Sequence, residues 1–173
     1  EVTQRFPELL EPEPLTDKDI ILDGELVVID QDKGIVEFEL VMSRFSSTTE
    51  RTIQSKLMEI PVIFVVFDIL HFGGKDLRSL PLMERKLILS EVVPKTNVFQ
   101  PILYIEDSGT ALFEAIHSSP FREGIVAKEK NSRYVSKRSN KWIKIIDYKY
   151  ESVAIRGFLK KEFGWLLSIE ENG

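Results

Sequence analysis

The sequence predicts an α+β fold, because strand-like and helix-like segments are mixed along a chain long enough to bury its own core. Val62–Leu70 (VIFVVFDIL) is apolar, rich in β-branched residues and closed by two glycines, a pattern typical of a strand. Leu82–Val93 places Leu82, Arg85, Lys86 and Leu89 at helical spacing and is followed by Pro94, which indicates an amphipathic helix. The 173 residues, 43% hydrophobic and 29% charged, have the composition of an ordinary globular domain.

The first third of the chain is expected to begin irregularly and then to form a strand. Three prolines disfavour regular helix in residues 1–19, which we interpret as a loop-rich lead-in. Ile20–Ile29 is rich in β-branched residues and is followed by the turn signal Asp-Gln-Asp-Lys-Gly. We therefore expect a strand, a turn and a short segment through Phe38. The polar residues 45–56 are expected to form a loop that leads into a helix.

The second half is expected to hold one more helix, Gly109–His117, and two pairs of short strands. A long basic connection separates the strands of the first pair, and a short turn separates those of the second. The pattern changes from Tyr150 onward, so a second domain is expected to begin near that residue. The predicted strands are Gly124–Lys128, Lys141–Ile146, Val153–Phe158 and Trp165–Ile169.

Composition excludes several classes of protein. The chain has no cysteine, and its two histidines, His71 and His117, cannot build a four-ligand zinc site. The longest apolar run, Pro61–Phe67, is far shorter than the ~20 residues of a membrane span. The N-terminus is acidic, whereas a secretory signal would be basic. We expect a cytoplasmic protein that has no membrane partner.

Charge is distributed unevenly along the chain, although the formal net charge is −5. Residues 1–60 hold 6 Lys or Arg and 14 Asp or Glu, a balance of −8, whereas residues 122–149 hold 9 and 3, a balance of +6. Association is steered by local potential rather than by the summed charge. An acidic chain can therefore carry a face that binds polyanions.

Acidic residues interrupt three of the predicted strands. They are Asp23 and Glu25 in LDGEL, Asp68 in VFDIL and Glu123 at the start of EGIVAK. A charge within a strand costs burial energy unless it is paired or belongs to a solvated site. Each one alone is explained by the end of a strand or by a pair with a lysine. Together, carboxylates from separate strands can converge and bind a hard cation such as Mg²⁺.

The segment 128–149 interleaves basic and aromatic residues. This combination suits a phosphate backbone and its bases, although a solvated surface loop would look the same in isolation. Cations and metal-type carboxylates in one short domain imply a phosphoryl or nucleotidyl substrate. The interleaved residues are Lys130, Arg133, Tyr134, Lys137, Arg138, Lys141, Trp142 and Lys144.

Four motifs, in order and at matching spacing, resemble motifs III, IIIa, IV and V of ATP-dependent DNA ligases. They are LDGELV at 22–27, VFDIL at 66–70, REGIVAK at 122–128 and KWIKI at 141–145. VTQRFPEL at 2–9 and SLPLMERK at 79–86 also resemble connecting segments of that family. The resemblance implies a fragment of an antiparallel-sheet nucleotidyltransferase (ATP-grasp-like) domain in residues 1–147. Residues 148–173 would then be the first strands of an OB-fold.

The resemblance also implies the chemistry, with ATP as the AMP donor and Mg²⁺ or Mn²⁺ as the metal. A lysine of the family attacks the α-phosphate of ATP, and the AMP passes to a 5′-phosphate at a nick, where the 3′-hydroxyl displaces it. By motif, Lys144 would contact the α-phosphate, and Lys128 would face the nucleotide beside it, both as catalytic residues.

The remaining implied roles belong to the acidic residues and one aromatic ring. Glu25 would contact the AMP ribose or a metal ion, with Asp23 supporting that turn, and Glu123 would bind the metal. Phe67 would stack on the adenine, although its apolar neighbours make plain core packing an equal explanation.

Two departures from the family pattern affect what we expect. The K-x-D-G motif that holds the nucleophilic lysine does not occur in the sequence. We therefore expect a fragment that starts after this motif and does not self-adenylate. Ile146 stands where the second lysine of motif V is usual. One phosphate contact is then missing unless Lys149 or another cation replaces it.

The expected parent activity is nick sealing, with nicked double-stranded DNA as the partner. End-joining or repair proteins are further candidate partners, and a monomer is expected. Three alternatives stay open: an RNA ligase or capping-type nucleotidyltransferase, a non-catalytic nucleic-acid-binding remnant, and a plain structural module.

Overall fold

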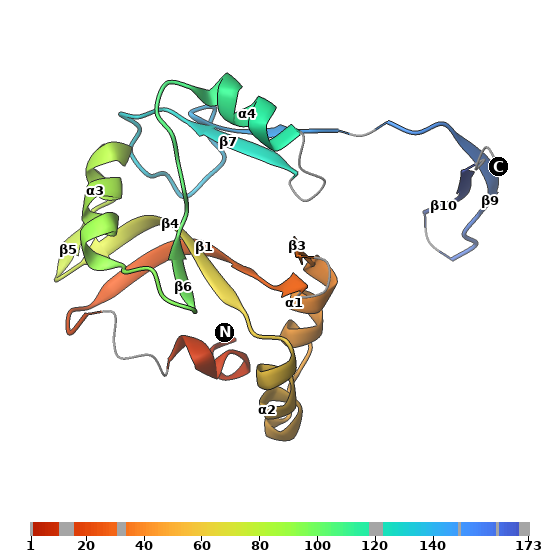
Figure 1. Cartoon of the computed structure of the whole chain (residues 1–173), viewed down its shortest axis with the longest axis horizontal. Helices are drawn as coiled ribbons and strands as arrows, with labels where there is room; N and C mark the ends of the chain where they lie inside the picture. Colours follow the sequence, from red (N-terminus) through yellow and green to blue (C-terminus); the bar gives the residue numbers. More distant parts are fainter. Residues whose placement is uncertain are drawn as a thin grey trace.

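A mixed four-stranded sheet forms the centre of the computed structural model, which describes residues 2–10, 16–30, 34–117, 123–148, 150–161 and 163–169 (Figure 1). Its long central strand β4 (Ile63–Phe72) pairs antiparallel with β1 (Ile20–Val27) and with the short β5 (Lys75–Asp76). The fourth strand, β6 (Phe99–Pro101), runs parallel to β4. The α+β class with antiparallel sheets is confirmed, and the three-residue β6 adds a parallel pairing at the edge of β4.

Helix α3 (Leu82–Val92) packs on β4 and closes the main hydrophobic core. Pro81 precedes its first residue, which suits the start of a helix because the ring fixes φ and needs no N–H partner. The helix was predicted over almost the same range. The buried residues of this core are Val66, Ile69, Leu77, Leu89, Val93 and Phe99.

The fully buried side chain of Arg44 holds a second region together, where the start of the chain meets two helices. The region contains 3₁₀ turns at Thr3–Arg5 and Pro7–Leu9, α1 (Phe38–Phe45) and α2 (Glu50–Glu59). The Arg44 guanidinium donates to Glu8 Oε1 at 2.7 Å and to three backbone carbonyls, those of Arg5, Lys56 and Ile60. A small core lies beside it, formed by Phe6, Val28 and Val62.

Helix α1 was not predicted, because an extended segment was expected through Phe38. The structure instead pairs β2 (Ile29–Asp30) with β3 (Ile35–Val36) and starts the helix directly after that hairpin. The polar run 45–56 was interpreted mainly as loop, but α2 occupies much of it. Thr49 caps α2 by accepting a hydrogen bond from Thr52 N at 3.3 Å, so the Ser and Thr residues serve helix ends there.

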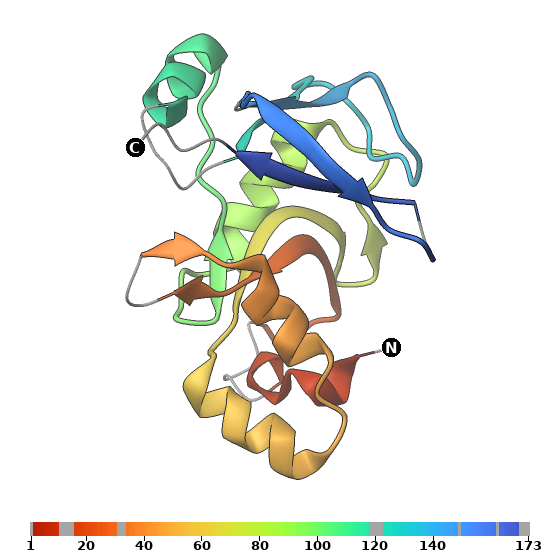
Figure 2. The same ribbon diagram turned by 90° about the vertical axis from the view of Figure 1, so that its right-hand side faces the viewer.

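A second, two-stranded sheet lies beside the first and carries the basic residues. It consists of β7 (Gly124–Lys128) and β8 (Trp142–Ile146), with α4 (Gly109–His117) packed on β7 (Figures 1 and 2). Both strands and the helix were predicted. Residues 129–141, called here the basic connection, join the two strands.

The last described element is the hairpin of β9 (Val153–Phe158) and β10 (Trp165–Ile169), which stands away from the sheets in Figure 1. These two strands were predicted, while their place in an OB-fold and a domain boundary at residues 147/148 stay predictions. Among the described residues, no helix is long and apolar enough to cross a membrane.

Candidate functional site

The ammonium group of Lys128 lies between two aromatic rings at the junction of the two sheets. Its Nζ is 3.7 Å from the ring centroid of Trp142, its cross-strand partner, and 4.7 Å from that of Phe67 on β4. Burial lowers the pKa of Lys128, while the charges of Asp68 and Asp23 act in the opposite direction. Phe67 is partly exposed and lies outside both cores. Its ring therefore faces the Lys128 ammonium and is not part of the described cores.

Lys144 and Glu123, predicted to hold a phosphate and a metal, contact each other directly. Lys144 Nζ donates to Glu123 Oε2 at 2.5 Å, and both side chains are exposed. This hydrogen bond and charge, with a further contribution from Glu25, raise the pKa of Lys144. Glu25 on β1 is thus electrostatically close to Lys144, so strands of the two sheets contribute to one charged cluster.

The described residues contain no group of three or more His, Asp or Glu side chains placed to hold a metal ion. Magnesium commonly uses only one or two protein carboxylates and completes its shell with phosphate oxygens and water. The roles of Glu25 and Glu123 as metal ligands stay predictions.

Asp23 holds the basic connection. Its Oδ2 accepts a hydrogen bond from the Tyr134 hydroxyl at 2.9 Å, and burial together with the Asp23 charge raises the pKa of Tyr134. Asp23 lies within strand β1, beside an irregularity in its pairing with β4, and not in a turn. Its contact with Tyr134 ties the first sheet to the segment between β7 and β8.

Asp68 does not belong to a cation site, and the expectation that it joins the other carboxylates is wrong. Its side chain is 0% exposed, and its two oxygens accept hydrogen bonds from Arg85 Nε and Nη2, both at 2.8 Å. A buried carboxylate with both oxygens held by a guanidinium is a structural ion pair.

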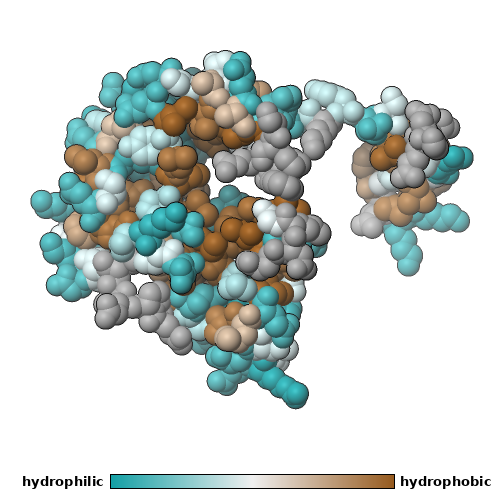
Figure 3. Space-filling view, in the orientation of Figure 1, coloured by the Kyte–Doolittle hydropathy of each residue, from teal (hydrophilic) through white to brown (hydrophobic). Residues whose placement is uncertain are grey.

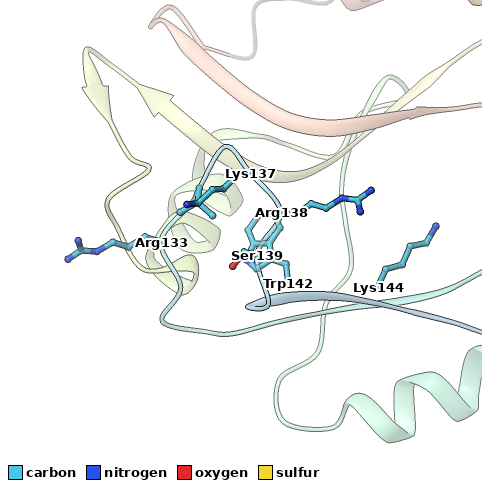
Figure 4. Close-up of a pocket in the computed structure, with 7 residues that line it drawn as sticks. Arg133, Lys137, Arg138, Ser139, Trp142 and Lys144 are labelled. Carbon is cyan, nitrogen blue, oxygen red and sulfur yellow. The ribbon is translucent and has the colours of Figure 1, made fainter.

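An open pocket of about 420 Å³, called here the cationic pocket, lies in the basic connection and the start of β8. Ion pairs within the described residues engage Lys130, Lys141 and Lys144, but none engages Arg133, Lys137 or Arg138. Figure 4 shows Arg138 and Lys144 pointing to one side of Trp142 and Arg133 pointing to the other. The lining residues are Arg133, Val135, Lys137, Arg138, Ser139, Trp142 and Lys144.

Ile146 lies opposite Gly124 in the β7–β8 ladder, two residues from Lys144 and thus on the same face. With isoleucine where the second lysine of motif V is usual, the face that carries Lys144 has one positive charge fewer. Lys149, the cation considered as a replacement, lies outside the described residues.

Sequence reasoning missed the partners that support the site. Arg85 and Lys86 were noted only for their helical spacing with Leu82 and Leu89, yet all four are buried. Two charges on the apolar face of a helix were the available signal, because such residues are rarely buried without a partner or a function. Ser132, also buried, carried no comparable signal.

The comparisons with known proteins agree with this geometry. The sequence model of the ATP dependent DNA ligase domain family matches residues 1–145. The chain belongs to this family of ATP-dependent DNA ligase domains.

Curated relatives are longer than this chain. A Bacillus subtilis (strain 168) protein named SPbeta prophage-derived DNA ligase-like protein LigB is 37% identical over 174 residues, which cover 97% of this chain and 58% of that protein. DNA ligase B of Mycobacterium tuberculosis (strain H37Rv) is 29% identical over 147 residues, covering 84% of this chain and 29% of that protein. The chain thus spans between about a third and three fifths of the length of these relatives.

Solved structures of ligases share the fold. Mycobacterial DNA ligase D complexed with ATP and MES matches with a TM-score of 0.64 and 26% identity, covering 95% of this chain and 50% of the other. The ligase domain from M. tuberculosis LigD matches with a TM-score of 0.66 and 28% identity, covering 89% and 47%. The predicted nucleotidyltransferase fold is confirmed by these matches.

Proposed function

We propose that this chain is the part of an ATP-dependent DNA ligase that binds AMP and the DNA phosphates during nick sealing. The observation that carries the proposal is the cationic pocket beside Lys128 and Phe67. It offers Arg133, Lys137 and Arg138 as cations without an ion-pair partner among the described residues. Phosphate backbones are bound chiefly by such cations.

The geometry supports distinct roles at the two ends of the site. At the Phe67 end, the adenine of ATP would replace the Lys128 ammonium on the ring, because both are attracted to its face. At the Lys144 end, the α-phosphate would compete with Glu123 for the lysine. A phosphate there would release the Glu123 carboxylate from its ion pair.

Mg²⁺ or Mn²⁺ would be held by Glu123 and Glu25, and when bound it would supply charge neutralisation at the phosphates. Lys144 would donate hydrogen bonds to the α-phosphate, and Asp23 would keep Tyr134 and the basic connection in place. Catalysis of phosphoryl transfer depends mainly on such positioning and charge stabilisation. Cytoplasmic localisation, a monomeric state and end-joining or repair partners stay predictions.

The test compares two sets of charge removals of similar size. The first variant changes Arg133, Lys137 and Arg138 together to Ala. The control changes Lys130 and Lys141 to Ala, because these two lysines are already paired with acids outside the pocket. Binding of a nicked DNA duplex should weaken about 10- to 100-fold in the first variant, with a shallower salt dependence. The control should lose far less affinity.

Matched substrates then address the class of ligase. Nicked duplexes of DNA and of RNA are compared in the same titration, and tighter binding of the RNA nick would favour an RNA ligase. Equal binding by the two charge variants would refute the cationic pocket as the phosphate site.

Self-adenylation is the second arm of this test. Since the sequence contains no K-x-D-G, incubation with Mg²⁺ and α-labelled ATP should leave no acid-stable label on the protein. A stoichiometric labelled band would show that another lysine acts as the nucleophile.

A further inference from the structure

Arg85 makes none of the proposed contacts with nucleotide or DNA, yet it reaches the segment that makes them. It is 0% exposed on α3, and besides its two bonds to Asp68 it donates from Nη1 to Leu80 O at 2.6 Å and to Ser132 O at 3.2 Å. Ser132 lies in the basic connection, next to Arg133. One guanidinium therefore joins β4, α3 and the pocket segment.

Ser132 also contacts Trp142, which lines the cationic pocket. It is 1% exposed, its hydroxyl donates to Glu129 O at 2.7 Å, and the same oxygen accepts from Trp142 Nε1 at 3.1 Å. The Trp142 ring in turn lies 3.7 Å from the Lys128 ammonium. A continuous series of contacts thus runs from the Asp68–Arg85 pair to Lys128.

Tyr134 gives the same segment a second attachment beside Arg85. Its ring centroid is 5.9 Å from the Arg85 guanidinium carbon and 5.6 Å from the Trp142 ring, which it meets edge to face. With its hydroxyl bound to Asp23, Tyr134 fixes the chain two residues after Ser132. Arg133 is therefore held from both sides, in a place set by buried groups.

We propose that Arg85 is a positioning residue for the cationic pocket, acting through Ser132 and Trp142, with Asp68 as the group that holds it. The role in ligation rests on the proposed function of the pocket, whereas the effect on the pocket's shape does not. Removing the donors of Arg85 should release Ser132, loosen the Trp142 indole and move it relative to Arg138 and Lys144, which point to one side of it.

The test replaces the buried ion pair without leaving a charge unpaired. Asp68→Leu/Arg85→Met substitutes apolar side chains of comparable size, an exchange that proteins often tolerate. The matched control is Asp76→Leu/Arg78→Met, because Arg78 also binds its aspartate through two nitrogens but on the exposed surface. Each variant removes one acid and one cation, so the net charge is unchanged.

Trp142 itself provides a readout that thermal stability alone would not move. The chain has two tryptophans, so a Trp165→Phe background leaves Trp142 as the single emitter. Quenching by iodide, relative to neutral acrylamide, reports the positive potential at the indole. We expect this ratio to fall at least about twofold in Asp68→Leu/Arg85→Met, and nicked-duplex affinity to fall about tenfold. Asp76→Leu/Arg78→Met should change neither.

The outcomes separate this proposal from the ligase function. A folded Asp68→Leu/Arg85→Met protein with an unchanged quenching ratio would overturn the positioning role. If the parent chain binds no nicked duplex, the proposed function fails, while the quenching ratio still decides about Arg85. Should the double variant not fold, Ser132→Ala removes the acceptor of Trp142 Nε1 together with the hydroxyl's own bond to Glu129 O. It should shift the ratio in the same direction by a smaller amount, and no shift would refute the proposal.

Discussion

The strand pairs β7–β8 and β9–β10 are both antiparallel, but they are attached to the rest of the molecule very differently. β7–β8 is tied to α3, β4 and β1 by Arg85, Ser132 and Tyr134, and α4 packs against it. In β9–β10 the described hydrogen bonds stay internal, as between Arg156 and Ser168. Its exposed large apolar residues are Val153, Ile155, Phe158, Trp165, Leu166, Leu167 and Ile169.

The difference bears on the binding site proposed for β7–β8. Two short strands alone are marginally stable in water, and a site needs cations held in place. Between β7 and β8, the chain on either side of Arg133 is fixed by hydrogen bonds of Ser132 and Tyr134 to other elements. Figure 3 shows the molecule in the orientation of Figure 1, with apolar surface gathered at the centre of its main body and hydrophilic residues around it.

Breaking the attachment of β7–β8 should have the largest effect. Arg85→Ala leaves the buried Asp68 carboxylate without a partner and should lower the free energy of unfolding by about 3–5 kcal/mol. The measurement is urea denaturation followed by circular dichroism. Arg78→Ala, in the exposed pair with Asp76, should leave the free energy of unfolding nearly unchanged. Similar losses in both variants would contradict the structural role of the buried pair.

The glycines of the two hairpins allow a matched comparison. Gly124 has φ +152°, and a Cβ there would lie 2.0 Å from Ile145 O, so Gly124→Ala should cost about 2–4 kcal/mol of stability. At Gly157 in β9 the nearest atom to a Cβ would be Leu166 Cδ1 at 3.4 Å. Gly157→Ala should therefore change stability by no more than about 0.5 kcal/mol. Denaturant unfolding of both variants tests this, and a tolerated Gly124→Ala would disprove the close contact.

Lys86 on α3 is buried, and burial disfavours its charged form. Burial first, and then the nearby Lys128 charge, lower the pKa of Lys86 to about 8 from an ordinary value of 10.5. Between these values the unfolded chain binds more protons than the folded one, so stability should rise as the pH rises from about 8 to about 10.5.

Lys86→Met should remove this dependence. At pH 7 the variant should be more stable than the parent by about 1–3 kcal/mol, and the difference should shrink towards pH 10. Thermal unfolding across this pH range measures it. Lys130→Met is the control, because Asp107 and Glu106 raise the pKa of that exposed lysine and no gain is expected. A pH-independent gain would show that the lysine charge is not the cause.

Removing the second hairpin should have the smallest effect. Deletion of residues 150–173 should change the free energy of unfolding of the rest by less than about 0.5 kcal/mol, because its apolar side chains face solvent. Urea denaturation of the shortened chain is the measurement. A loss above about 1 kcal/mol would reveal contacts that stabilise the sheets.

Local pattern was sufficient to predict most strands and helices, and its failures have physical reasons. Val62–Leu70 is a continuous β-branched apolar run and Leu82–Val93 lies between two prolines, and both formed close to their predicted ranges. α1 was missed although Phe38, Met42 and Phe45 follow helical spacing, because those side chains are largely exposed and the preceding β-branched run favoured a strand. The three residues of β6 are too few to show any period.

The site was predictable only as far as its contacts repeat a known pattern. The resemblance pointed to Phe67, Lys128, Glu123 and Lys144, and the structure places these in two neighbouring pairs. Their roles with nucleotide and metal stay predictions. The attachment through Arg85 could not be predicted, because a carbonyl such as that of Ser132 is present at every residue and only tertiary packing selects one.

The hydrogen bond between Tyr134 and Asp23 joins residues 111 positions apart, and that between Arg85 and Ser132 spans 47. Contacts between residues so far apart in the sequence require long loops to close. Loop closure costs conformational entropy before the contact can stabilise the fold, so we expect these contacts to form late in folding. Helices α3 and α4 and the β7–β8 ladder need only local contacts and can form earlier. A chain that has formed only these local elements would then still lack an assembled cationic pocket, which requires the two sheets to dock.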